Sequence, residues 1–211
     1  MRGGLLALLL AVSPALAEPE PTLGRIRDEA QLAEMLSSIL QDPALRAKDP
    51  QARATAQALM TEGVRQLRAG AYIQALANFL DAYDKLPSPK LLLNIASTLH
   101  DMGRFADAAN TYNRYIADPD SGSEHVAEVK ELLTKLDGQL TILVVRVFPR
   151  GSDVSIDGGP FISVGSSFVT RVRAGIHLVR IRKGGASSEV SVNGFEASTT
   201  KKSANNSLVS G

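Results

Sequence analysis

The chain has 211 residues, contains no cysteine, and carries a formal net charge of +1. The lack of thiols excludes disulfide bonds, thiol catalysis and cysteine-based zinc sites. The near-neutral total conceals a division. Residues 18–138 contain 13 Lys and Arg against 18 Asp and Glu (net −5), whereas residues 139–211 contain 9 against 4 (net +5). An acidic first half followed by a basic second half indicates two regions of different composition.

The first 17 residues have the pattern of a secretory signal peptide. Arg2 precedes an apolar run over residues 5–12, and Ala15-Leu16-Ala17 supplies small residues at the cleavage positions. The run is shorter than the roughly 20 apolar residues that span a bilayer. We therefore expect cleavage after Ala17 and an exported protein, located in the periplasm or associated with the cell envelope, with no transmembrane segment.

Residues 18–138 have the hydrophobic spacing of α-helices. An amphipathic helix is expected over 23–40, within an N-terminal helical segment (18–48). Residues 49–138 predict five more helices: one from Asp49 to the turn at Gly70, then 72–86, 89–102, 105–117 and 123–136. Four signals support these limits: Asp49-Pro50, Ser88-Pro89, a capping box of Ser121 with Glu124, and Gly138 as a left-handed C-terminal cap.

One pattern occurs twice in this helical region, at an offset of 33 residues. The repeated positions are small, aromatic, small and aromatic: Gly70 and Gly103, Tyr72 and Phe105, Ala75 and Ala108, Phe79 and Tyr112. Glycine lets the chain turn tightly, alanine lets two helices approach closely, and the aromatic rings fill the space between neighbours. The repeat therefore predicts two similar helix hairpins, stacked side by side.

This region resembles the tetratricopeptide repeat family over roughly residues 54–119. The first copy matches at Gly63, Gly70-Ala71-Tyr72, Ala75, Phe79, Ala82 and Pro87. The second copy matches at Gly103-Arg104-Phe105, Ala108 and Tyr112, but has Ala96 where the family usually has glycine and Tyr115 where it usually has alanine. The resemblance implies a concave surface, made by the first helix of each pair, that binds an extended peptide or a partner helix.

The candidate partner-binding groove comprises positions on these first helices: Met60, Val64, Leu67, Lys90, Leu93, Asn94, Ser97 and His100. Family members that hold a peptide C-terminus use paired Asn residues with Lys or Arg, and Asn94 with Lys90 matches part of that pattern. Val64 stands where the first copy would need its Asn. Two copies are fewer than the three or so that usually stand alone. The groove therefore either receives a partner or is shallow and covered by the N-terminal helix.

Residues 139–199 are rich in β-branched residues and interrupted by Gly, Pro and Asn, as expected for strands. Ala174-Gly175 and Asn193-Gly194 are predicted hairpin turns, and Asp157-Gly158-Gly159 a tight turn. The stretches FPRGSDVSIDG (148–158) and RAGIHLVRIRKGG (173–185) resemble the PEGA domain of bacterial envelope proteins. Gly165 is not followed by that family's Thr-Thr-Pro, and Ala186 replaces its aromatic residue.

The predicted fold class is therefore α+β in two separate domains. An all-α, tetratricopeptide-like helical stack (49–138) precedes a small antiparallel β-sandwich of the PEGA kind (139–199). The tail over residues 200–211 is polar, and we expect it to be disordered.

In a hairpin that turns at Ala174-Gly175, Val172, His177, Val179 and Ile181 would share the buried side. Four arginines would share the opposite side: Arg171, Arg173, Arg180 and Arg182. Guanidinium groups pair well with carboxylate and phosphate, so this face is a candidate contact for anionic envelope polymer. The alternatives are a solvated face, or one that docks on the chain's own acidic helices. No aromatic residues interleave with the arginines, and nucleic-acid binding is not expected.

The chain has three histidines, none at a spacing typical of metal ligands, and no motif of a nucleophile elbow, phosphate loop or dinucleotide site. We expect no enzymatic activity, no metal site and no cofactor. The leading hypothesis is a non-enzymatic exported adaptor, whose helical groove binds a protein or peptide while its β domain lies at the envelope. The alternative is an architectural module whose β domain binds wall glycan or an anionic polymer, with the helices as a spacer.

Overall fold

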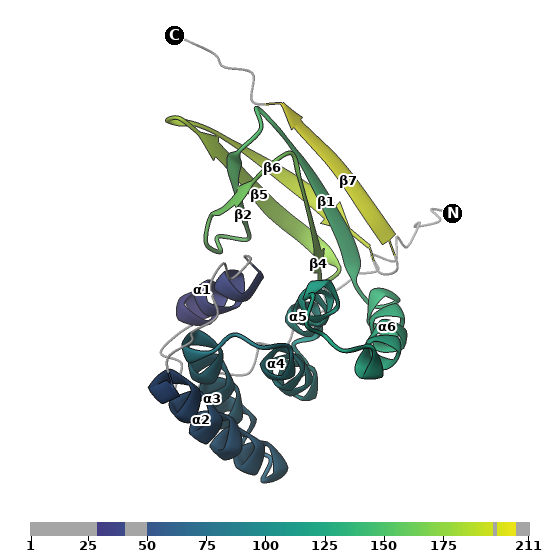
Figure 1. The fold of residues 1–211 in the computed structure, drawn as a ribbon. Coiled ribbons are helices and arrows are strands. Elements are labelled where there is room, and N and C mark those ends of the chain that lie inside the picture. Colours follow the sequence, from purple (N-terminus) through teal and green to yellow (C-terminus); the bar gives the residue numbers. More distant parts are fainter. Residues whose placement is uncertain (1–28, 41–49, 196–197, 206–211) are drawn as a thin grey trace, which may run out of the picture.

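The computed structural model describes residues 29–40, 50–195 and 198–205; the predicted signal peptide and the Asp49 cap lie outside them. Within these ranges six helices precede seven strands (Figure 1). The helices are α1 (Glu29–Leu40), α2 (Pro50–Arg68), α3 (Tyr72–Lys85), α4 (Pro89–Asp101), α5 (Phe105–Ala117) and α6 (Ser123–Asp137). The strands are β1 (Thr141–Phe148), β2 (Ser152–Ile156), β3 (Ile162–Val164), β4 (Ser167–Val172), β5 (Gly175–Lys183), β6 (Ala186–Gly194) and β7 (Ser198–Asn205). This order confirms the α+β class with the helices first.

The helix ends show which capping predictions hold. Ser88 caps α4, because its side-chain oxygen accepts a hydrogen bond from the N–H of Leu91 (3.4 Å). The predicted capping box is wrong: α6 begins after Gly122, and the Ser121 hydroxyl donates instead to the carbonyl of Asp118 (2.7 Å). Gly138 is not left-handed (φ −67°, ψ −17°). The chain keeps its right-handed turn there and runs on directly toward β1.

The duplicated pattern forms two helix hairpins, α2–α3 and α4–α5, with the same turn between their helices. Gly70 and Gly103 have positive φ angles of 72° and 75°, which glycine adopts without a Cβ penalty. Each glycine N–H bonds to the carbonyl three residues before it, at 3.0 and 2.9 Å. Ala75 and Ala108, at the start of the second helices, are both fully buried. The two similar hairpins predicted from the repeat are therefore present.

The helices enclose one hydrophobic core. Phe79 of α3 and Leu92, Ile95 and Leu99 of α4 are completely buried at its centre. Helix α1 adds side chains from outside the repeat, among them Leu32, which has no exposed surface. Burial of each such side chain contributes about 1.5–3 kcal/mol relative to exposure.

Among the described residues, none of the helices combines the length and apolar character needed to cross a membrane.

The strands form two packed sheets rather than a succession of hairpins. One sheet has the order β4-β1-β7 and the other β3-β2-β5-β6. All pairings are antiparallel except that of β1 with β7, which is parallel. The two sheets share a core to which β1 contributes Leu143 and Val145 and β5 contributes Val179 and Ile181.

Both predicted hairpin turns are wrong. The chain changes sheets at Ala174-Gly175, because β4 pairs with β1 while β5 pairs with β2 and β6. Asn193-Gly194 ends β6, and the chain then continues to β7, which lies beside β1. Among the described strands, the hairpins that do form join β2 to β3 and β5 to β6, the latter at Gly184-Gly185, both with positive φ. The buried residues of β4 and β5 face the same core from opposite sheets. Their alternation of buried and exposed positions is therefore the same as in a hairpin, and the sequence pattern does not distinguish the two arrangements.

Residues 198–205 form β7, although the sequence led us to expect disorder from residue 200 onward. In the register of the sheet, Thr141 lies opposite Ser198 and Phe148 opposite Asn205. Pairing with β1 supplies backbone hydrogen bonds that a polar composition cannot indicate. The disorder prediction is therefore wrong for this part of the tail.

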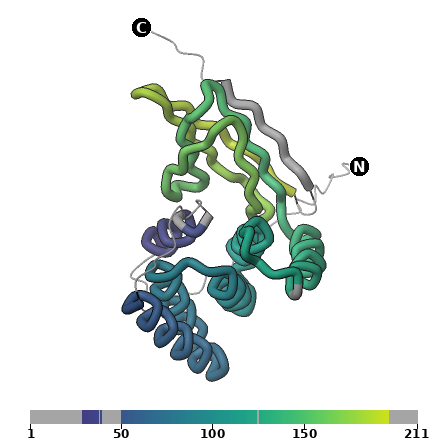
Figure 2. Tube along the Cα trace, in the orientation of Figure 1, coloured from purple at the N-terminus to yellow at the C-terminus, as the bar shows by residue number. Residues whose placement is uncertain are grey.

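The helical region and the sandwich have separate hydrophobic cores and meet at one end of the sheets. Helix α5 packs against β4, and β1 starts directly after α6 and runs away from the helices (Figure 1). Figure 2 follows this path from the helices into the strands. The turn between β5 and β6 and the end of β1 thus lie far from the helical repeats.

Candidate functional site

The predicted groove residues lie on α2 and α4, the first helix of each hairpin, which are in contact. Of the eight, Lys90 is exposed and the other seven are partly buried. The apolar members, Met60, Val64, Leu67 and Leu93, pack against the edge of the helical core. They combine core packing with partial exposure.

Helix α1 does not cover this surface. Its main helical contact is α5, the second helix of the α4–α5 hairpin, and it lies beside that helix, next to the end of the sandwich (Figure 1). Its buried residues, such as Leu32 and Ile39, extend the core on this side. The alternative in which the N-terminal helix fills the groove does not apply to residues 29–40.

A pocket of about 170 Å³ lies between α4 and α6, with Tyr112 of α5 among its lining residues. Leu93 and Ser97 are the groove residues that the structure brings to it. The lining from α6 comprises His125, Glu128, Val129 and Leu132. The sequence reasoning missed these positions, although their i, i+3, i+4, i+7 spacing marks one face of a helix.

The polar side chains at this surface differ in whether they have hydrogen-bond partners. The hydroxyls of Ser97 and Tyr112 are hydrogen-bonded at 3.1 Å. Burial raises the pKa of the Tyr112 phenol, although the bond to Ser97 acts in the opposite direction, so Tyr112 is neutral at physiological pH. The side-chain amide nitrogen of Asn94 is buried and has no hydrogen-bond partner among the described residues. An unpaired buried donor is costly, and rotation of this side chain toward a bound acceptor would remove that cost.

His100 and Lys90 lie at the two ends of the groove segment of α4. The His100 ring lies against Phe105, with ring centroids 5.4 Å apart. Its Nδ1 is 3.6 Å from the carboxylate of Asp101. This position fixes the imidazole by packing, and Lys90 at the opposite end supplies an exposed positive charge.

The four arginines predicted to share one sheet face do not do so. Arg171 lies in β4 and belongs to one sheet, whereas Arg180 and Arg182 lie in β5 and belong to the other. Arg173 lies between the two strands. The prediction fails because the chain crosses from sheet to sheet between Arg171 and Arg180, so a common period does not mean a common face.

Three of these guanidinium groups are paired within the chain. Arg180 contacts Glu189 at 2.6 Å. Arg182 contacts Asp153 at 3.1 Å and stacks on the Phe161 ring at 3.9 Å. Arg171 binds Asp137, at the end of α6, at 2.5 Å. Arg171 therefore docks on one of the chain's own acidic helices, which was one of the alternatives for these arginines.

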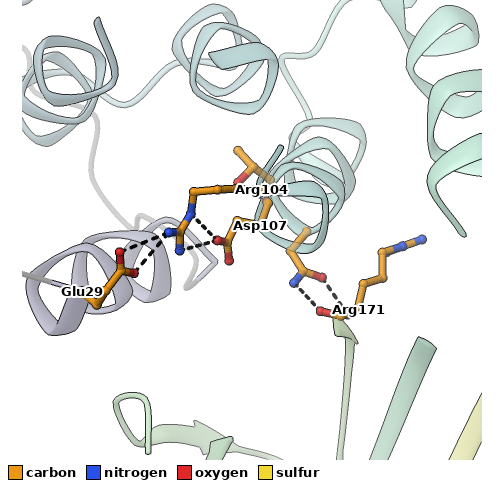
Figure 3. Close-up of polar contacts among 6 residues, drawn as sticks. Glu29, Arg104, Asp107 and Arg171 are labelled. Carbon is orange, nitrogen blue, oxygen red and sulfur yellow. Dashed lines mark hydrogen bonds and ion pairs between the residues drawn. The ribbon is translucent and has the colours of Figure 1, made fainter. Parts of the chain in front are cut away.

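A cleft lies where α1 and α5 meet the sandwich. It consists of two adjoining pockets of about 220 and 480 Å³. Arg104 occupies its wall: Nη1 is 3.2 Å from a carboxylate oxygen of Glu29 in α1, and Nε is 2.9 Å from Asp107 in α5 (Figure 3). The whole lining contains three arginines (Arg104, Arg171 and Arg173) and three carboxylates (Glu29, Asp107 and Asp157), so these two groups balance in charge. The sequence reasoning did not identify this cleft, because Glu29 and Arg104 are 75 residues apart.

Hydrogen bonds across this cleft join the helices to the sandwich. The Asn110 side chain of α5 donates to the carbonyl of Arg171 (3.0 Å) and accepts from its N–H (2.9 Å). Because β4 is an edge strand, this amide satisfies backbone groups that would otherwise remain open. The cleft is a polar joint between two apolar cores.

His177 and Asp157 form a pair that superficially resembles an acid–base dyad. The Nδ1 atom is 2.6 Å from Asp157, and Nε2 is 2.7 Å from the carbonyl of Arg173. The hydrogen bond to Asp157 raises the pKa of His177, burial opposes this, and the Arg173 carbonyl adds to it. Since both ring nitrogens are engaged, neither can take a proton from a nucleophile. The pair instead ties the turn at Asp157 to β5, and we refer to His177 with Asp157 as the clasp.

The clasp holds the turn between β2 and β3, as predicted for Asp157-Gly158-Gly159. Asp157 has a positive φ of 52°, and the N–H of Gly159 bonds to the carbonyl of Ile156 (2.9 Å). Burial raises the pKa of the Asp157 carboxyl, but hydrogen bonds from His177 and the N–H of Leu178 outweigh it, so the net shift is downward.

The remaining histidine, His125, is half-exposed beside Glu128 at 3.7 Å. In the part of the chain that the structure describes, no three His, Cys, Asp or Glu side chains gather as metal ligands would.

No protein-family model matches the chain, and no curated protein is significantly similar to it.

Proposed function

We propose that the protein is a non-enzymatic, exported adaptor. The surface of α2 and α4, extended by α6, receives an extended peptide or a helix of a partner protein. The sandwich holds this surface at the cell envelope, in the periplasm. The tetratricopeptide and PEGA resemblances and the signal-peptide pattern support this reading.

One observation carries the proposal. Two hairpins with the same glycine turn are stacked so that their first helices share a side, and α1 packs on the opposite side against α5. The shared side retains partly exposed apolar residues and the unpaired amide of Asn94. A peptide backbone offers the acceptor that this amide lacks and an apolar side chain for the pocket beside Leu93.

The test compares capture of partners by the mature protein, predicted to begin at Glu18, and by two variants. Leu93→Arg places a cation in the pocket between α4 and α6, and Lys90→Glu reverses the exposed charge nearby. The protein is recovered from its own envelope fraction, and the co-purifying proteins are identified and quantified. We expect a specific partner with the native protein, at least tenfold less with Leu93→Arg, and a smaller loss with Lys90→Glu.

A matched control is Ile176→Arg, which introduces the same cation at an apolar side chain 78% exposed on the sandwich. It should capture the partner at the native level. Thermal unfolding of each variant separates a folding defect from a binding defect. The proposal fails if the same proteins are captured with Leu93→Arg, or if none is captured by the native protein. Recovery of wall polymer unaffected by Leu93→Arg would favour the architectural alternative.

A further inference from the structure

The end of the sandwich farthest from the helices carries an exposed aromatic ring. Phe148, the last residue of β1, is 67% exposed. Because β1 rises about 3.3 Å per residue, this ring lies about 23 Å from the start of the strand beside α6. The adjacent turn, residues 149–151, and the β5–β6 turn at Gly184-Gly185 complete the end. We refer to Phe148, these two turns and the cations beside them as the distal tip.

Three exposed cations belong to this end: Arg146 and Arg150, each two residues from Phe148, and Lys183, which bonds to the turn at 149–151. Among the described residues none of them has an acidic partner within ion-pair distance. This distinguishes them from Arg171, Arg180 and Arg182, each of which is paired with a carboxylate. Among the described residues, the distal tip therefore carries exposed positive charge that no carboxylate offsets.

Hydrogen bonds hold the two turns of the tip together. Lys183 Nζ donates to the carbonyls of Gly151 (2.7 Å) and Arg150 (3.1 Å), and the Ser152 hydroxyl donates to the carbonyl of Pro149 (2.7 Å). Gly151 has a positive φ of 74°. The backbone of the turn that follows Phe148 is thus braced, so it requires little additional ordering on contact.

We propose that the distal tip docks on an anionic lipid bilayer. The Phe148 ring enters the interfacial layer, where aromatic side chains are favoured. Arg146, Arg150 and Lys183 contact the lipid phosphates, each attracted by the negative surface potential. This orientation directs the α2–α4 surface away from the membrane. The proposal rests on the envelope location in the proposed function, and it is independent of the groove.

The arrangement favours a membrane over a soluble anionic polymer. A polymer chain is held by cations in a row along a groove or face, whereas these cations share one protruding end of the sandwich with an exposed aromatic ring. An exposed Phe adds nothing to a purely electrostatic contact, but it strengthens contact with lipid through burial of apolar area.

The test measures co-sedimentation of the mature protein with vesicles made of equal parts phosphatidylcholine and phosphatidylglycerol, and with phosphatidylcholine alone. We expect binding to the mixed vesicles only, weakening as salt is raised. Each cation contributes about fivefold in affinity, so Arg146→Gln with Arg150→Gln should weaken binding about 25-fold. Phe148→Ala should weaken it about tenfold, from partial loss of apolar burial.

The matched control is Phe195→Ala, because Phe195 is 64% exposed but lies just after β6, at the helical end of the sandwich. It should bind vesicles as the native protein does. Equal binding to both vesicle types, or full binding by Phe148→Ala, would overturn the proposal. So would binding to heparin, a soluble polyanion, without binding to either vesicle. Tip variants should still capture the protein partner, so this failure is distinguishable from failure of the adaptor proposal.

Discussion

Gly63 in α2 lies directly against the ring of Phe79 in α3. A Cβ atom at position 63 would stand 2.6 Å from Cε1 of that ring, which is itself completely buried. The two helices of the first hairpin approach this closely only because residue 63 has no side chain. The glycine that aligns with the tetratricopeptide pattern thus has a steric reason in this chain.

Gly63→Ala should destabilise the protein by about 1–2 kcal/mol. Overpacking costs about 1–3 kcal/mol, and the better helix propensity of alanine returns up to about 1 kcal/mol. Urea denaturation followed by circular dichroism measures the change. Gln57→Ala, on the exposed face of the same helix, should change the free energy of unfolding by less than about 0.5 kcal/mol. An unchanged midpoint for Gly63→Ala would contradict the close approach.

Gly70→Ala and Gly103→Ala should destabilise the protein by the same amount, about 1 kcal/mol each. Both glycines have a positive φ, and a Cβ would meet no atom within 4 Å at either position. The left-handed backbone is therefore the sole source of the penalty. Gly165→Ala, which also opens into free space without a positive φ, is the control. Clearly unequal costs would show that the two turns are not equivalent.

Asn110→Ala should loosen the joint between the helices and the sandwich. It removes both hydrogen bonds to the Arg171 backbone, and leaving partly buried groups unpaired should cost about 1–2 kcal/mol. Hydrogen exchange should show faster exchange of the Arg171 amide, with α2 and α3 unchanged. Asn113→Ala, at an exposed position on the same helix, should leave exchange at Arg171 as it is. Unaltered exchange in Asn110→Ala would exclude a bracing role.

The His177–Asp157 clasp should stabilise the fold in a defined pH window. The pKa of His177 is raised above its ordinary value of 6.5. Its contribution is therefore complete below about pH 6.5 and is lost as pH rises through the raised pKa. The pKa of Asp157 is lowered below 3.8, so its contribution is complete above about pH 3.8 and is lost as pH falls through the lowered pKa.

The measurement is the difference in free energy of unfolding between the native protein and His177→Gln. We expect a larger difference at about pH 5.5 than at about pH 9. Gln57→Ala, which replaces an exposed side chain that does not titrate, should give a difference that hardly varies with pH. A His177→Gln difference that grows toward pH 9 would contradict a clasp formed by the imidazolium.

The helices were predictable because their signals are local. Hydrophobic period, Ser88 before Pro89 and the glycine turns act within a few residues of the bonds that they specify. The cap at Ser121 failed even so, because Gly122 precedes the first residue of α6 and Ser121 lies one residue outside the capping position, where its hydroxyl donates to the carbonyl of Asp118. A capping pattern shows that a side chain is able to cap a helix, but the position at which the helix starts decides whether it does.

Of the seven residues that line the pocket between α4 and α6, two were equally accessible from sequence. Leu93 and Ser97 follow from the repeat, whereas the α6 side of the pocket does not belong to it. The arginines show the opposite outcome: a regular spacing suggested a shared face, but the residues occupy different sheets. Their partners, such as Asp137 for Arg171, are distant in sequence, and composition contains no information about them.

The sequence by itself determined the order of helices and strands and the duplicated hairpin, since these depend on short-range backbone bonds and on the conformational freedom of Gly70 and Gly103. Only the tertiary structure decided which strands pair. Strand β1 joins β4 and β7 although β2 is its neighbour in the chain, because strand pairing is selected by burial of both sheets against one core rather than by proximity along the chain. That same choice pairs Arg171, Arg180 and Arg182 with carboxylates and leaves Arg146, Arg150 and Lys183 at the free end, where Phe148 is exposed.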